Sequence, residues 1–284
     1  MTGSPSTSAE AARKRVADML REIRRDAGLQ VKDVAGRTGW YASKVSRLQS
    51  GTTPPSDDDI RAWCRACEAE DQAADVIAAS RTAENAYVEW RRLQRTGMRR
   101  LQESYVPLFE RTRTFRVYSS NVIPGLLQTG PYVAALLSSI SEFRGTRNDI
   151  EEAVAARLER SRVIREGNHR FSLLVEEAAL RHRVGDVDTM AGQLDHLLTV
   201  MSYPRVSFGV IPFSSDRRMW VIETFSVYDE EQAQVELLTA QVNVTAPTEV
   251  RQYLKAFGEY AKLAVYGAEA RALVTAAADA LEPA

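Results

Sequence analysis

The helix predicted over residues 41–49 carries side chains whose types suit hydrogen bonding to the edges of nucleic-acid bases. Its outward positions hold Tyr41, Ser43, Ser46 and Arg47. An arginine can form a two-pronged hydrogen bond with guanine O6 and N7 in the major groove, and a serine hydroxyl can bond to a base edge. We therefore predict that these four residues contact DNA bases.

A second group of polar side chains surrounds the same helix and suits the DNA backbone better. Its members are Gln30, Lys32, Lys44, Thr52 and Thr53. Contacts of cations, amides and hydroxyls with phosphate position a protein on the duplex without reading its sequence. We predict these five residues as phosphate contacts.

The elements that must position these side chains are two short helices joined by a tight turn. Ala35 is small enough for two helices to cross closely, and Gly39, four residues later, suits a left-handed turn conformation. Val34, Val45 and Leu48 form the inner face. These offsets predict a helix-turn-helix; the alternative is a generic helical hairpin within a larger α domain.

The surrounding pattern predicts a compact helical unit. Apolar positions recur at helical spacing from Glu10 to near Gly28, and Ser56 followed by three aspartates begins a fourth helix. The fold class is mainly α: an N-terminal all-α helix-turn-helix domain (9–80), a helical connector (81–116) and a C-terminal mixed α/β domain (117–284). Residues 1–8 are predicted to be a disordered N-terminus.

Four segments of the C-terminal part predict strands because they are β-branched or aromatic: 171–177, 205–213, 224–231 and 234–240. Helices are predicted over 149–166, 187–202 and 248–265. Ile123-Pro124-Gly125-Leu126-Leu127 is either core packing or the wall of a ligand pocket or partner groove. Trp220 lies either in a hairpin or in an exposed contact loop.

Charge is distributed in blocks although the net charge is −1. Residues 1–51 contain ten Lys/Arg and five Asp/Glu, whereas residues 52–80 contain two and seven. A basic N-terminal segment joined to an acidic remainder is typical of a polyanion-binding domain attached to another part of different function. No apolar run spans a bilayer, no signal peptide is expected, and two cysteines form no disulfide framework, so we predict a cytoplasmic protein without a membrane partner.

The segment LREIRRDAGLQVKDVAGRTGWYASKVSRLQSGTTPP resembles the phage-repressor-like (xenobiotic-response-element, XRE) family of helix-turn-helix regulators over roughly residues 13–68. Many members have a phosphate-contacting glutamine at the position that Val31 occupies here, with Gln30 just before it. The resemblance implies a DNA-binding transcriptional regulator.

Residues from about 85 onward resemble the C-terminal domain of a large actinobacterial group of such regulators, which is described as toxin–antitoxin antitoxin-like. The motifs that carry this resemblance are IPGLLQT (123–129), AARLERSRVI (155–164) and VEEAALRHRVG (175–185). The resemblance implies a bacterial transcription factor that commonly has a small partner protein encoded nearby. It implies no particular ligand or operator.

The other potentially reactive side chains do not indicate a catalytic site. Cys64 and Cys67 share one helix face, which favours buried small hydrophobes over a redox-sensing pair, and no second ligand pair completes a zinc site. Glu176 and Glu177, with Arg181 close by, lack a nucleophile, metal set or phosphate loop. We predict no enzyme, no metal and no cofactor.

These observations predict a sequence-specific transcriptional regulator that binds double-stranded DNA as a homodimer on a roughly palindromic operator. Its C-terminal domain is predicted to dimerise and to sense a small-molecule effector or a partner protein. The alternative is an antitoxin-like protein that sequesters a small partner protein, with DNA binding serving mainly autoregulation.

Overall fold

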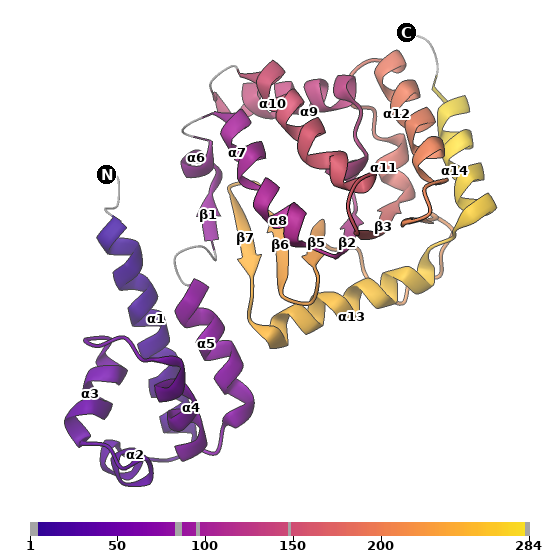
Figure 1. Cartoon of the computed structure of the whole chain (residues 1–284). Coiled ribbons are helices and arrows are strands. Elements are labelled where there is room, and N and C mark those ends of the chain that lie inside the picture. The colour runs from indigo at the N-terminus through magenta and orange to yellow at the C-terminus, as the bar shows by residue number, and fades with distance from the viewer. Residues whose placement is uncertain (1–4, 83–86, 95–96, 147–148, 282–284) are drawn as a thin grey trace. The chain divides into compact units, whose positions relative to one another are not determined.

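The computed structural model describes residues 5–82, 87–94, 97–146 and 149–281 of the 284-residue chain (Figure 1). It forms two compact units: residues 1–87 with 243–251, and residues 88–242 with 252–284. No helix of the described segments is long and apolar enough to cross a membrane. A mainly α fold with a C-terminal α/β region is confirmed.

The first unit is built from helices in the order the sequence predicts. They are α1 (Pro5–Asp26), α2 (Val31–Thr38), α3 (Ala42–Ser50), α4 (Asp57–Ala66), the short 3₁₀ helix η1 (Glu70–Gln72) and α5 (Ala73–Thr82). The α4 helix begins where expected because the Ser56 hydroxyl accepts a hydrogen bond from the Asp59 amide. The Asp59 carboxylate in turn accepts one from the Ser56 amide, which completes a reciprocal cap.

An apolar cluster holds these helices together around Trp63, which is fully buried. The Trp63 indole Nε1 donates a 3.0 Å hydrogen bond to the Leu20 carbonyl oxygen, so its polar atom is satisfied inside the core. Cys64 and Cys67 are buried free thiols in the same cluster, which confirms the reading of both as small apolar core residues. Burial raises the pKa of the Cys64 thiol to about 11.

The second unit is organised by a seven-stranded sheet with the strand order β1-β7-β6-β5-β2-β3-β4. The strands are β1 (Tyr87–Glu89), β2 (Thr114–Ser119), β3 (Arg170–Glu176), β4 (Val206–Ile211), β5 (Phe225–Tyr228), β6 (Gln232–Glu236) and β7 (Ala240–Val244). The β2, β3 and β4 strands are parallel, whereas β5 runs antiparallel to both β2 and β6. The sheet is therefore mixed, as the α/β prediction requires.

Helices cover both faces of this sheet (Figure 1). They are α6 (Trp90–Leu93), α7 (Met98–Ser104), α8 (Val106–Arg111), α9 (Gly130–Arg144), α10 (Ile150–Arg160), α11 (Glu177–Arg181), α12 (Val187–Val200), α13 (Pro247–Leu263) and α14 (Gly267–Asp279), with 3₁₀ turns η2 (Gly125–Leu127) and η3 (Ser161–Ile164). On one face, Phe115 stacks on Phe171 across β2 and β3, with ring centroids 4.8 Å apart. On the other, Tyr118 of β2 stacks on Tyr260 of α13.

The expected helical connector over 81–116 needs correction. Its described residues include strand β1 and the first three residues of β2, and only parts of it are helical. The Trp90 indole donates a 2.7 Å hydrogen bond to the Leu237 carbonyl oxygen, which ties this segment to the sheet region 147 residues away. Such pairing depends on residues that are far away in the sequence, which local composition does not reveal. The Arg-rich composition of the segment therefore favoured a helix.

The disordered N-terminus expected over 1–8 is also corrected in part. Residues 5–8 form the start of α1, and residues 1–4 lie outside the described residues. Proline suits the first turn of a helix because that turn needs no amide donor, and this helix begins at Pro5.

Candidate nucleic-acid interface

The α2–turn–α3 geometry has the left-handed glycine that the sequence predicts. Gly39 has φ 70° and ψ 19°, and the Trp40 amide donates a 3.0 Å hydrogen bond to the Ala35 carbonyl oxygen. A side chain in that conformation would be strained, so glycine lets the chain leave α2 and enter α3 at once. Ala35 is buried at the closest part of this turn, as expected.

The inner face of α3 is anchored from beneath. Val45 and Leu48 are buried, and α3 ends at Gly51, which has φ 74°. Two arginines of α1 brace the same end: Arg21 Nη2 donates to the Gln49 carbonyl oxygen at 2.6 Å, and Arg24 Nε donates to Gln49 Oε1 at 3.1 Å. These two cations hold the end of α3 against α1.

The outer face of α3 presents the predicted base-contacting group together. Tyr41, Ser43, Ser46 and Arg47 are all exposed, with Tyr41 at 84%. Ser43, Ser46 and Arg47 stand three and four residues apart, which places them on one side of the helix. The Arg47 side chain has no hydrogen bond or ion pair with any part of the chain that the structure describes. Its five donors are therefore free for an external acceptor.

Lys44 differs from the other predicted phosphate contacts because its charge already has partners. Its Nζ lies 2.6 Å from Asp59 Oδ1 of α4 and 4.1 Å from the centre of the Trp40 ring. Burial of the Asp59 carboxylate opposes ionisation, but the hydrogen bonds from Lys44 and Ser56 outweigh it and lower the pKa of Asp59 below its ordinary value. Lys44 thus links α3 to α4, and its phosphate contact stays a prediction.

The remaining predicted phosphate contacts lie at helix ends. Gln30 precedes the first turn of α2, and its backbone amide donates to Asp33 Oδ2 at 2.8 Å. Lys32, Thr52 and Thr53 are exposed. The amides of both threonines bond to the Arg47 carbonyl oxygen, at 3.1 and 3.3 Å, which leaves the two hydroxyl-bearing side chains beside the end of α3.

The structure adds one cation that the sequence prediction missed. A Cβ atom on Gly51 would lie 3.4 Å from the Arg13 carbonyl oxygen, so α1 passes directly by the turn that carries Thr52. The Arg13 side chain is exposed. Nothing in local spacing links residue 13 to residue 52, because their proximity comes from the packing of α1 on α3. Arg13 therefore joins Thr52 and Thr53 as a candidate phosphate contact.

The acidic pair considered for catalysis in the second unit is occupied by structural bonds. The Glu176 carboxylate accepts from the Tyr118 hydroxyl at 2.8 Å and forms a bidentate ion pair with Arg217. Glu177 pairs with Arg181 at 2.8 Å and accepts from the Phe213 amide. These contacts fasten the end of β3 to neighbouring segments.

Two family models match the chain. One, described as a helix-turn-helix domain, covers residues 15–76 and contains the whole α2–turn–α3 unit. The other, described as a domain of unknown function (DUF5753), covers residues 102–276. No curated protein matches. The DNA-binding class of the first unit is thus supported independently of its geometry.

Proposed function

The chain belongs to the DUF5753 family and carries a helix-turn-helix domain, and on this premise we propose that it is a sequence-specific transcriptional regulator. The observation that carries the proposal is the outer face of α3, where the exposed Arg47 has no partner in the described part of the chain and stands beside two serines. That set suits the donors and acceptors of a major groove.

We further propose that the regulator acts as a homodimer. A single recognition helix with four base-contacting side chains supplies few specific bonds, whereas two copies on half-sites about one helical turn apart double them. The phage-repressor-like resemblance supports this arrangement. The second unit is proposed to dimerise and receive the signal, and no catalytic role is proposed for it.

The decisive experiment measures operator binding of Arg47→Ala across single-base variants of sites recovered by genome-wide footprinting. Loss of a base-contacting arginine should cost about 1–3 kcal/mol at the base pair it reads and relax specificity there. Arg65→Ala is the matched control, because Arg65 is an equally charged, exposed residue in the last turn of α4. Equal losses at every operator variant would contradict the role assigned to Arg47.

The antitoxin-like alternative predicts a different outcome in the native host. If Arg47→Ala abolished operator binding but left the biological output unchanged, sequestration of a partner would be the main task. Exposed apolar side chains of the second unit, Phe213, Trp220 and Val221, give that alternative a surface to use. Co-purification of a small protein with the wild-type chain and with Arg47→Ala would support it.

A further inference from the structure

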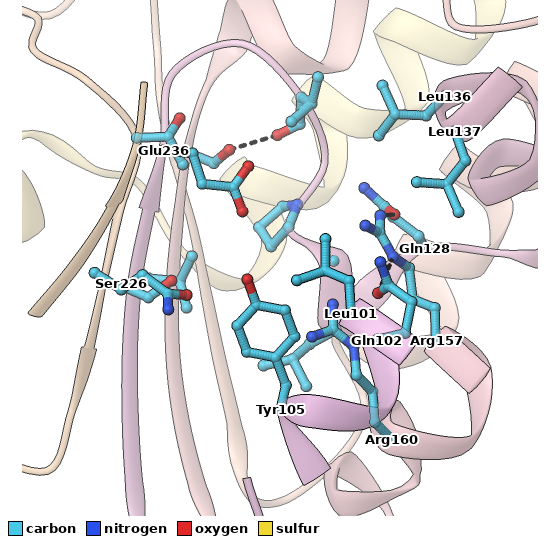
Figure 2. A pocket seen from close by; sticks show the side chains of 18 of the residues that line it. Leu101, Gln102, Tyr105, Gln128, Leu136, Leu137, Arg157, Arg160, Ser226 and Glu236 are labelled. Carbon is cyan, nitrogen blue, oxygen red and sulfur yellow. Dashed lines mark hydrogen bonds between the residues drawn. The ribbon is translucent and has the colours of Figure 1, made fainter. Parts of the chain in front are cut away.

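A cavity of about 160 Å³ lies in the second unit between the sheet and a group of helices (Figure 2). Strand β2 contributes Phe115 and Val117, α7 contributes Leu101, and α9 contributes Leu136 and Leu137. The IPGLLQT motif forms another wall through Ile123, Pro124, Gly125, Leu126 and Gln128. The motif therefore belongs both to the core and to the wall of a pocket, since Ile123 is fully buried in the core and also lines the cavity.

Two arginines of α10, Arg157 and Arg160, stand about one turn apart and line the cavity beside these apolar side chains. Arg157 Nε donates to Gln102 Oε1 at 3.0 Å, and its Nη1 donates to Gln128 Oε1 at 2.7 Å. The Arg160 guanidinium lies over the rings of Tyr105 and Phe109, 4.7 and 5.0 Å from their centres. The Arg160 Nε is shielded from water and has no hydrogen-bond partner among the residues that the structure describes.

The charge of this pair is only partly offset by the described residues, through the Glu236 carboxylate that lines the same cavity. The partners of Arg157 are neutral amides, those of Arg160 are rings, and neither guanidinium forms an ion pair within the described segments. Desolvation, and then the neighbouring charge of Arg160, lower the pKa of Arg157 to about 10. Desolvation also lowers the pKa of Arg160. Desolvating two like charges with one carboxylate to offset them is costly, so an anion in the cavity would relieve part of that cost.

The opposite wall offers hydrogen-bond acceptors. Figure 2 shows Glu236 on the sheet side of the cavity, facing the helix side from which Arg157 and Arg160 extend. Gln94 also lines the cavity, and its buried Oε1 atom has no donor within the described part of the chain. A third cation, Arg144, stacks on Trp90 at 4.7 Å, so the charged lining contributed by the described residues is three arginines and one glutamate.

We propose that this cavity binds a small organic acid with an apolar, ring-sized body. Its carboxylate is held by Arg157 and Arg160, and a hydrogen-bond donor at its far end faces Glu236. The size follows from the volume: a cavity of about 150 Å³ accommodates a benzene ring. A carboxylate matches the planar fork of a guanidinium, and the aliphatic and aromatic walls match the body.

The role of this site as the effector site rests on the proposed function, whereas binding itself rests on the cavity and its charges. The two are therefore measured separately, binding by titration of the acid and function by operator affinity with and without it.

The probe is 4-hydroxybenzoate, titrated into the full-length protein and followed by ligand-observed NMR. An occupant of this size should bind with a Kd on the order of 0.1–1 mM. The neutral isostere 4-hydroxybenzamide should bind at least tenfold more weakly than 4-hydroxybenzoate. Acetate, a carboxylate without the apolar ring, should also bind at least tenfold more weakly. Equal binding of the acid and the amide, or no binding of the acid, would overturn the proposal.

Arg160→Met tests the assigned anion contact, because methionine keeps an apolar chain against Tyr105 and Phe109 and removes the charge. We expect at least a tenfold loss of affinity for 4-hydroxybenzoate with unchanged circular dichroism. Arg162→Met is the matched control: Arg162 is exposed nearby and pairs with Glu159 and Glu166 outside the cavity. Loss of affinity in the control to the same extent would contradict the site.

Arg157→Lys provides a second variant if Arg160→Met does not fold. Lysine keeps the charge and lacks the planar fork, so the affinity for the acid should fall several-fold while weak anion binding remains. Unchanged affinity in this variant would contradict the proposal. Acid binding at Arg157 and Arg160 without any change in operator affinity would leave the site standing and remove its regulatory role.

Discussion

The recognition helix α3 and the cavity helix α10 use arginine in opposite ways. Arg47 of α3 is exposed and keeps its hydration, and the residues beneath it do the packing. Arg157 and Arg160 of α10 are half-buried, and their side chains lie among aromatic and aliphatic side chains. An exposed, hydrated cation suits a large polyanion, whose condensed counter-ions are released on binding. A desolvated pair of cations suits a small anion that fits inside one cavity.

The contrast also concerns stability. An exposed arginine can be removed at little cost to folding, so its presence on α3 reflects binding. The half-buried pair on α10 carries a desolvation penalty that the ligand-free protein must bear.

The largest effect is expected at Trp63. Trp63→Ala removes a fully buried indole and its hydrogen bond to the Leu20 carbonyl oxygen, so the free energy of unfolding should fall by about 3–5 kcal/mol. Urea unfolding followed by circular dichroism measures the change. Trp220→Ala is the control, since Trp220 is 72% exposed. A comparable loss of unfolding free energy in both variants would mean that the burial of Trp63 does not account for its contribution to the core beneath α3.

A smaller effect is expected at the turn after α3. Gly51→Ala forces a Cβ onto a residue with φ 74°, 3.4 Å from the Arg13 carbonyl oxygen, so unfolding free energy should fall by about 1–2 kcal/mol. Gly36→Ala is the opposite case, because Gly36 lies within α2 with no atom within 4 Å of the added Cβ. That variant should gain about 0.5–1 kcal/mol in thermal or urea unfolding.

The Lys44–Asp59 pair should make a pH-dependent contribution. The pKa of Asp59 is lowered in the folded protein, so its stabilisation is full above the ordinary carboxyl value and is lost as pH falls through the lower folded value. Asp59→Asn should therefore cost about 0.5–1 kcal/mol at pH 7 and less at pH 3, which lies below the ordinary carboxyl value. Unfolding curves at both pH values check this, and an equal difference at both would contradict the role of ionisation.

The smallest effect on folding is expected at Arg47. Arg47→Ala should change the free energy of unfolding by less than about 0.5 kcal/mol, because its exposed side chain has no partner among the described residues. Urea unfolding beside operator binding separates the two quantities. A loss of more than about 1 kcal/mol would show that Arg47 supports the fold, and the contrast with α10 would no longer hold.

Prediction from sequence succeeded where the relevant contacts are local. The boundaries of α2 and α3 follow from Gly39 and from apolar residues three and four positions apart. Strands β3 to β6 were expected near their observed positions. The sheet strands β1, β2 and β7 were missed. The β2 segment TFRVYS has a strand-like alternation, but it follows directly on helical residues, so local pattern did not separate the two.

The candidate sites divide in the same way. The outer face of α3 could be read from a run of seven residues, and the structure brings those residues together. Lys44 shows the limit, because only the packing of α4 against α3 reveals that Asp59 holds its charge. Arg13 shows the reverse, since the fold carries a distant cation to the end of α3.

The sequence by itself determined the helix-turn-helix and the residues it exposes, because helical periodicity and one left-handed glycine decide which side chains face outward. The tertiary structure decided that Arg157 and Arg160 meet Leu101, Ile123 and Glu236 around one cavity. Those residues come from segments up to 135 positions apart and are joined only by strand pairing and helix packing. Local patterns carry no information about such distances, and so the second site emerges only from the folded chain.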